Sequence, residues 1–138
     1  MKRALILAGL GLLASQVQAK EPEAKGADPG QSVAISPVAL PIVVNGKLAN
    51  YVFVNLRLEL MPNANGAKLR DKEPFFRDAL VRAAHRSPFT LASDLTKIDE
   101  AKLKTSMMRE AQAIAGPGQV RAVVILSQQP KSLRPRPA

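Results

Sequence analysis

The chain has 138 residues, contains no cysteine, and carries a net charge of +9 from 20 Lys and Arg against 11 Asp and Glu. Without cysteine it has no disulfide, thiol nucleophile or cysteine zinc site, and a single histidine excludes a multi-histidine metal centre. Only 4% of the residues are aromatic and Trp is absent, which argues against a stacking platform for sugars or single-stranded nucleic acid. The composition therefore favours a non-enzymatic module that uses no cofactor and no small-molecule substrate.

The first 19 residues have the layout of a secretory signal. Lys2 and Arg3 precede an apolar run over residues 4–14, and Val17-Gln18-Ala19 is a small-residue cleavage pattern. The alternative is an uncleaved anchor, but this run of 11 residues is shorter than the roughly 20 needed to cross a bilayer. We predict a signal peptide over residues 1–19, an exported chain of 119 residues, and a net charge lowered to +7 by the loss of Lys2 and Arg3.

The mature chain is expected to begin with a linker. Residues 20–34 are rich in Pro, Gly and charge, which is typical of a flexible segment. Apolar content rises from residue 33 to residue 44, where Pro37 and Pro41 cannot donate to a sheet ladder. These residues predict an edge strand or an extended lead-in, and they open an ordered domain over residues 35–129.

A hairpin turn and a strand follow. Asn45-Gly46 is a strong tight-turn signal, because both residues tolerate positive φ. After it, apolar residues alternate with others at a period of two, which predicts a strand with one face toward the core. The predicted core face carries Val52, Val54, Leu56, Leu58 and Leu60, and the other face carries Tyr51, Phe53, Asn55, Arg57 and Glu59.

Two helices are predicted next. Asp71, Glu73 and Pro74 indicate the start of the first helix, and Ser87-Pro88 ends it. Its predicted buried stripe is Phe76, Ala79, Leu80, Ala83 and Ala84, opposite Asp78, Arg82 and His85. Two i,i+4 ion pairs are expected, one in each helix: Asp78 with Arg82 and Glu100 with Lys104.

The second helix is predicted to begin near Thr96, with Asp99 completing a short capping box. Its buried stripe is Leu103, Met107, Ala111 and Ile114, and Gly116-Pro117-Gly118 stops it. Residues 120–126 are apolar and β-branched apart from Arg121, which predicts a central strand. The pattern as a whole predicts an α+β domain, with a small sheet of three to four strands covered on one face by two helices.

The basic charge extends into the last segment. Residues 130–138 contain three prolines with Lys131, Arg134 and Arg136, and we expect a disordered basic tail. A basic surface attracts anionic lipid, an acidic partner or nucleic acid. Nucleic acid is disfavoured for an exported chain with no binding motif, and a solvated surface with helical ion pairs is the favoured interpretation.

Few residues suggest chemistry. His85, Ser87 and Asp78 form the one conceivable hydrolytic set, but helical spacing puts His85 on the polar stripe and Ser87 at a helix end, so surface and capping roles are favoured. Five carboxylates could be considered as ligands of a hard cation: Asp71, Glu73, Asp94, Asp99 and Glu100. They lack the spacing of a calcium loop, and each has a simpler role at a helix start or in a turn.

Tyr51 and Phe53 carry the clearest hint of a binding surface. If the even-numbered residues face the core, these two aromatic side chains lie together on the other face of the sheet. They form either a contact patch for a partner or a cross-strand packing pair covered by the lead-in strand or linker. The sequence leaves both alternatives open.

The ordered series of elements resembles the periplasmic domain of the FliL family of flagellar basal-body-associated proteins. The resemblance covers residues 35–129 and rests on several weak motifs in order. These are Ala39-Leu40-Pro41-Ile42-Val43-Val44-Asn45, the strand 51–60 ending in Leu-Glu-Leu, Pro74-Phe75-Phe76-Arg77-Asp78-Ala79-Leu80, the segment 91–95, the helix with Leu103, and the strand 120–128.

The resemblance implies a stomatin-like (SPFH-like) domain that self-associates around flagellar stator units and supports the motor, with neither catalysis nor a cofactor. Arg77 and Asp78 are the matching positions that carry over most clearly as contact candidates, beside Tyr51 and Phe53. Family members typically keep an N-terminal membrane-spanning helix, whereas this chain has the cleavage-like signal. We therefore expect a soluble periplasmic domain, whose basic tail makes a weak contact with anionic membrane at roughly 1 kcal/mol or less per charge. The alternative is a periplasmic adaptor of the same fold with no flagellar role.

Overall fold

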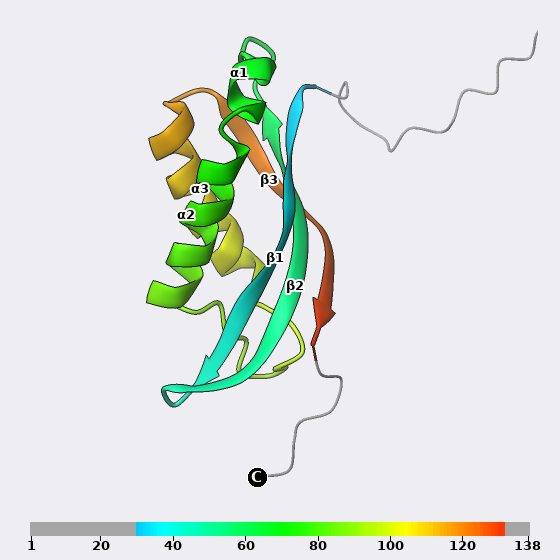
Figure 1. Ribbon diagram of the computed structural model, residues 1–138, viewed down its shortest axis with the longest axis vertical. Coiled ribbons are helices and arrows are strands. Elements are labelled where there is room, and N and C mark those ends of the chain that lie inside the picture. Colours follow the sequence, from blue (N-terminus) through cyan, green and yellow to red (C-terminus); the bar gives the residue numbers. More distant parts are fainter. Residues whose placement is uncertain (1–29, 132–138) are drawn as a thin grey trace, which may run out of the picture.

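The computed structural model describes residues 30–131, which form a three-stranded sheet with three helices (Figure 1). The elements in chain order are β1 (Ser32–Val44), β2 (Lys47–Leu60), α1 (Gly66–Arg70), α2 (Glu73–Arg86), α3 (Glu100–Ala115) and β3 (Val120–Pro130). The predicted α+β class is confirmed, as a sheet of three strands with α2 and α3 on one face. The predicted signal peptide, most of the linker and residues 132–138 of the tail lie outside the described residues.

The sheet is antiparallel, with β2 between β1 and β3. The β1–β2 hairpin closes through Asn45 and Gly46, whose φ values of 51° and 75° are the left-handed conformation that a two-residue turn requires. β1 pairs with β2 from Ser32 opposite Glu59 to Val44 opposite Lys47. The predicted turn and the predicted edge position of the first strand are both confirmed.

The core lies between the sheet and the helices. The five even-numbered apolar residues of β2, from Val52 to Leu60, are all 0% exposed, as the period of two predicts. The whole predicted stripe of α2 is also buried, and so are Leu103, Met107 and Ala111 of α3. Ile114 is only partly buried at the edge of the core. α2 lies over β1, and α3 lies over β3.

The first and last strands differ from the predictions. β1 begins at Ser32, inside the range assigned to the linker, because Val33 is 1% exposed and joins the core. β3 continues to Pro130, the first residue of the predicted tail. The prediction of a central strand at residues 120–126 is wrong, because β3 is an edge strand and Leu126 is 48% exposed. An apolar run reports high strand propensity and partial burial, and it does not report the number of neighbouring strands.

Two helix starts also differ from the predictions. α3 begins at Glu100 instead of near Thr96, because Asp94 accepts hydrogen bonds from the backbone N–H and hydroxyl of Thr96 and holds that residue in a turn. Asp99 is the N-cap and accepts from the N–H of Lys102 at 3.1 Å. The short helix α1 was not predicted, and it begins at the N-cap Asn65, which accepts from the N–H of Lys68.

Across residues 30–131, none of the helices is long and apolar enough to span a membrane.

Candidate functional site

The sheet has one face that the described helices leave uncovered, and we call it the open face. It is formed by the odd-numbered residues of β2 with their neighbours on the adjoining strands: Ala34, Ala39, Tyr51, Phe53, Asn55, Arg57, Glu59, Ala122 and Gln129. Phe53 is 46% exposed on the middle strand of this face, between Ala39 of β1 and Gln129 of β3. An alanine beside a phenylalanine covers little of the ring, so the open face presents an aromatic surface to solvent.

β1 does not cover the two aromatic side chains of the open face, because it lies beside β2 in the sheet. Tyr51 is half-buried, pairs with Pro41 of β1, and has the ammonium of Lys131 6.0 Å from its ring centroid. That distance is at the outer limit of a cation–π contact. The linker, which was the other cover considered from the sequence, lies mostly outside the described residues, so a contact patch at Tyr51 and Phe53 stays a prediction.

An ion-pair cluster lies at the other end of the open face. The carboxylate of Glu59 accepts hydrogen bonds from Arg121 at 3.0 Å and from Arg57 at 3.3 Å. The hydrogen bond from Arg121 is the main reason that the pKa of Glu59 lies below its ordinary value, with Arg57 lowering the pKa further. Glu59 is therefore ionised at neutral pH and links β2 to β3 electrostatically.

Arg77 and Asp78 lie on α2, away from the open face. Asp78 forms an ion pair with Arg82 at 3.2 Å, as predicted, and Arg77 lies 3.9 Å from Glu73. Both pairs join residues one helical turn apart, and the exposed pair of Asp78 with Arg82 contributes only a few tenths of a kcal/mol. The four candidate contact residues thus separate into two groups, one on the sheet and one on the helical layer.

The residues of the conceivable hydrolytic set are exposed and engaged locally. The Nδ1 atom of His85 is 2.8 Å from the carbonyl oxygen of Val81 in its own helix, and Ser87 is the C-cap residue of α2. Asp78 lies nearly two turns earlier and is paired with Arg82. None of these three side chains is buried. Their surroundings match the surface and capping roles favoured from the sequence.

The carboxylates considered as cation ligands are spread over the fold. Asp94 and Asp99 hold the turn and the helix start described above, and the hydrogen bond from the Thr96 hydroxyl lowers the pKa of Asp94. Glu73 accepts from the N–H of Ser36 at 2.9 Å. Glu100 accepts from the amide of Gln128 at 2.6 Å, and the described part of the chain contains no Glu100–Lys104 ion pair. No group of three or more acidic or histidine side chains within residues 30–131 is arranged to hold a metal ion.

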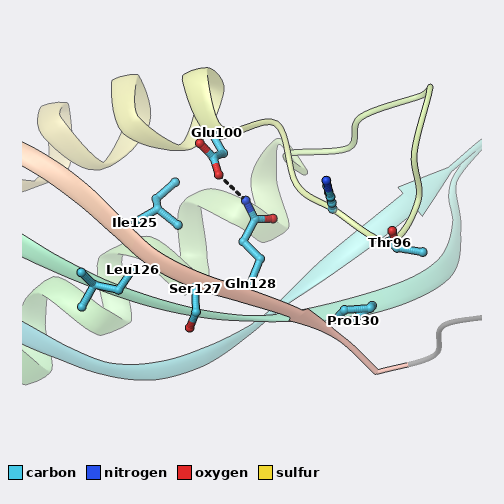
Figure 2. Close-up of a pocket in the computed structure, with 8 residues that line it drawn as sticks. Thr96, Glu100, Ile125, Leu126, Ser127, Gln128 and Pro130 are labelled. Carbon is cyan, nitrogen blue, oxygen red and sulfur yellow. Dashed lines mark hydrogen bonds between the residues drawn. The ribbon is translucent and has the colours of Figure 1, made fainter.

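A groove lies between the outer edge of β3 and the start of α3 (Figure 2). We call it the β3 groove; its volume is about 430 Å³, and its lining includes Lys97, Glu100, Ile125, Leu126, Gln128 and Pro130. In Figure 2 the Ile125 side chain points toward α3, and the Gln128 amide reaches across to Glu100. Sequence reasoning missed this groove because it placed β3 inside the sheet. The feature of the sequence that could have indicated the groove is the uncharged stretch 122–129 between Arg121 and Lys131.

Comparison of the chain with protein-family models and with curated proteins found no match.

Proposed function

We propose that this chain is an exported, non-enzymatic assembly protein, similar to the FliL family, that supports the flagellar motor through contacts with stator or basal-body proteins and with copies of itself. The observation that carries the proposal is the open face, which the described helices leave uncovered and where Phe53 is 46% exposed on the middle strand. Aromatic side chains exposed on a flat surface favour protein recognition, since they bury large areas at low cost in conformational entropy.

The order of weak motifs that resembles the FliL family supports the flagellar part of the proposal. The arrangement of the candidate chemical groups supports its non-enzymatic part, because His85 and Asp78 lie exposed on α2 with local partners, and Ser87 is exposed at its C-cap. The alternative of a periplasmic adaptor with no flagellar role keeps the same open face and is favoured by the signal-like start. Flagellar genes beside the coding gene favour the first function, and their absence favours the adaptor.

A deletion strain tests the proposal. We expect reduced swimming and swarming, and recovery of stator proteins when the tagged chain is purified from membranes treated with a crosslinker. Normal motility together with no recovered stator protein would refute the flagellar function.

Complementation of the deletion strain then tests the surface. The variant Phe53→Ser removes the aromatic ring from the open face, whereas Phe75→Ser removes a ring that is 64% exposed on α2. We expect Phe53→Ser to lose motility and stator recovery and Phe75→Ser to restore both. The reverse result would place the contact on the helical layer, with Arg77 and Asp78.

A further inference from the structure

Two asparagines of the chain are followed by glycine, and the fold places them in different surroundings. Asn45-Gly46 forms the turn between β1 and β2, whereas Asn65 is the N-cap of α1 and Gly66 is its first residue. Figure 1 shows the hairpin turn at one end of the sheet and α1 at the other. Asparagine before glycine is the sequence in which deamidation is fastest, because glycine has no side chain to hinder its own nitrogen.

Deamidation requires that the glycine nitrogen reach the side chain of the asparagine before it. The nitrogen attacks the asparagine Cγ atom, and the new N–Cγ bond closes a five-membered succinimide ring. The Cγ–NH2 bond breaks, and the NH2 group leaves as ammonia with the proton that the glycine nitrogen gives up. Water then adds to one of the two ring carbonyls, and the ring opens to aspartate or isoaspartate. A hydrogen bond that holds either reacting group elsewhere slows the attack.

The hairpin pair has no such restraint. Asn45 and Gly46 are exposed, and within residues 30–131 neither the Asn45 side chain nor the Gly46 N–H has a hydrogen-bond partner. Among the described residues nothing beyond the chain neighbours lies within 4 Å of the position that a Cβ atom on Gly46 would occupy. The three residues after the turn, Lys47, Leu48 and Ala49, are exposed as well. Exposed loop tips with few contacts open locally at a low free-energy cost, which lets the two groups meet.

The second pair is held at both of its reacting groups. The side-chain oxygen of Asn65 accepts from the N–H of Lys68 at 3.1 Å, and the N–H of Gly66 donates to the side-chain oxygen of Gln31 at 3.0 Å. The Gln31 amide also donates to the carbonyl of Ala64 at 2.8 Å, which fixes its orientation. Gly66 is buried. Attack on Asn65 therefore requires that the Gln31 contact and the helix cap both break.

We propose that Asn45 is a site of spontaneous deamidation in the folded chain, and that the helix cap and the Gln31 contact protect Asn65. The reaction uses water as its co-reactant and needs no enzyme. It converts a neutral turn residue into a carboxylate next to Lys47, and it divides the chain into an aspartate form and an isoaspartate form.

The two products have different effects on the hairpin. Asp-Gly favours the same two-residue turn as Asn-Gly, so the aspartate form keeps the hairpin. Isoaspartate adds a methylene to the backbone, and the longer turn no longer fits the pairing of Val44 with Lys47. Just before the turn, Thr90 accepts from the N–H of Val43 at 3.1 Å and donates to its carbonyl at 2.8 Å. We therefore expect isoaspartate to disorder residues 44–49 and to leave the core intact.

The test follows both pairs in one sample of the purified chain, incubated at mildly alkaline pH. Trypsin separates them, because Asn45 lies in the peptide 26–47 and Asn65 in the peptide 58–68. Mass spectrometry measures the gain of one dalton, and digestion in oxygen-18 water marks any reaction during sample preparation. We expect Asn45 to react at least tenfold faster than Asn65 in the folded chain, and the two rates to agree within threefold in urea.

A matched pair of variants tests the protection of Asn65. Gln31→Ala removes the acceptor of the Gly66 N–H, whereas Gln112→Ala truncates an exposed glutamine of α3. We expect Gln31→Ala to speed the reaction of Asn65 at least fivefold without changing that of Asn45, and Gln112→Ala to change neither. Circular dichroism checks that both variants are folded.

A third variant tests the effect of the products. Asn45→Asp reproduces the aspartate form, and the isoaspartate form is separated from aged protein by chromatography and identified by an isoaspartyl methyltransferase. We expect small amide chemical-shift changes next to the turn in Asn45→Asp, and loss of the hairpin signals over residues 44–49 in the isoaspartate form.

Three results would overturn the inference. Equal rates at the two pairs in the folded chain, or a faster reaction of Asn65, would show that the turn is no more reactive than the helix cap. The same ratio of rates in urea and in the folded chain would show that sequence neighbours set the rates. No response of Asn65 to Gln31→Ala would refute the protection by Gln31.

Discussion

Neighbouring residues of β2 have opposite surroundings on the two faces of the sheet. Val52 and Val54 are 0% exposed beneath the helical layer, whereas Phe53 between them is 46% exposed on the open face. The covered face buries aliphatic side chains and so provides most of the hydrophobic stabilisation. The open face buries less, and it carries Phe53, one of the contact residues that we propose. The comparison shows that the residues that stabilise the fold and the proposed contact residue lie on opposite faces of one strand.

The largest effect that tests this division is expected from two adjacent phenylalanines of α2. Phe76 is 0% exposed and Phe75 is 64% exposed. We expect Phe76→Ala to lower the free energy of unfolding by about 3–5 kcal/mol, because it removes a ring from the core and leaves a cavity. Phe75→Ala should change it by less than about 0.5 kcal/mol. Urea denaturation measures both, and equal losses would contradict the assignment of the helix faces.

The next largest change in the free energy of unfolding is expected from a comparison of two residues on opposite faces of β2. Leu56→Ala truncates a side chain that is 0% exposed, and we expect a loss of about 2–5 kcal/mol. Phe53→Ala, on the open face, should cost less than about 1 kcal/mol, although it removes more atoms. Should Phe53→Ala cost as much as Leu56→Ala, the open face would be covered by a further part of the chain.

A smaller effect is expected at the start of the helical layer. Asp99→Ala removes the side-chain oxygen that accepts from the N–H of Lys102, and such caps contribute about 0.5–2 kcal/mol. Asp78→Ala is the control, since its exposed pair with Arg82 is worth about 0.3–0.5 kcal/mol. Thermal unfolding followed by circular dichroism compares them, and a larger loss for Asp78→Ala would refute the capping role.

The smallest effect is a pH dependence on the open face. Because the pKa of Glu59 is lowered in the folded chain, its ion pairs stabilise the fold above the unfolded-state pKa of about 4.3. That stabilisation is lost as the pH falls through the lower folded-state pKa. We expect wild type to exceed Glu59→Gln in stability at pH 6 by about 1 kcal/mol or less, and the difference to shrink below pH 4. A difference that is independent of pH would show that the charge of Glu59 contributes nothing.

Periodicity and turn chemistry in the sequence determined most of the local structure. The alternation from Val52 to Leu60 specified which side chains of β2 are buried, and the stripe from Phe76 to Ala84 did the same for α2, because burial of one face imposes a period on the residues that form it. Asn45-Gly46 specified the hairpin, since few other pairs adopt two successive positive φ values. The candidate residues Tyr51 and Phe53 followed from the same alternation.

Strand order and the surfaces that depend on it were decided only by the tertiary structure. The run from Val120 to Leu126 has the composition of a central strand, yet β3 is at the edge, because hydrogen-bonding neighbours are chosen by long-range pairing and leave no periodic mark in the sequence. The hydrogen bonds of Glu73 and Thr90 to β1, and the groove between Gln128 and Glu100, join residues at least 28 positions apart. Such contacts exist only once the helical layer has packed onto the sheet.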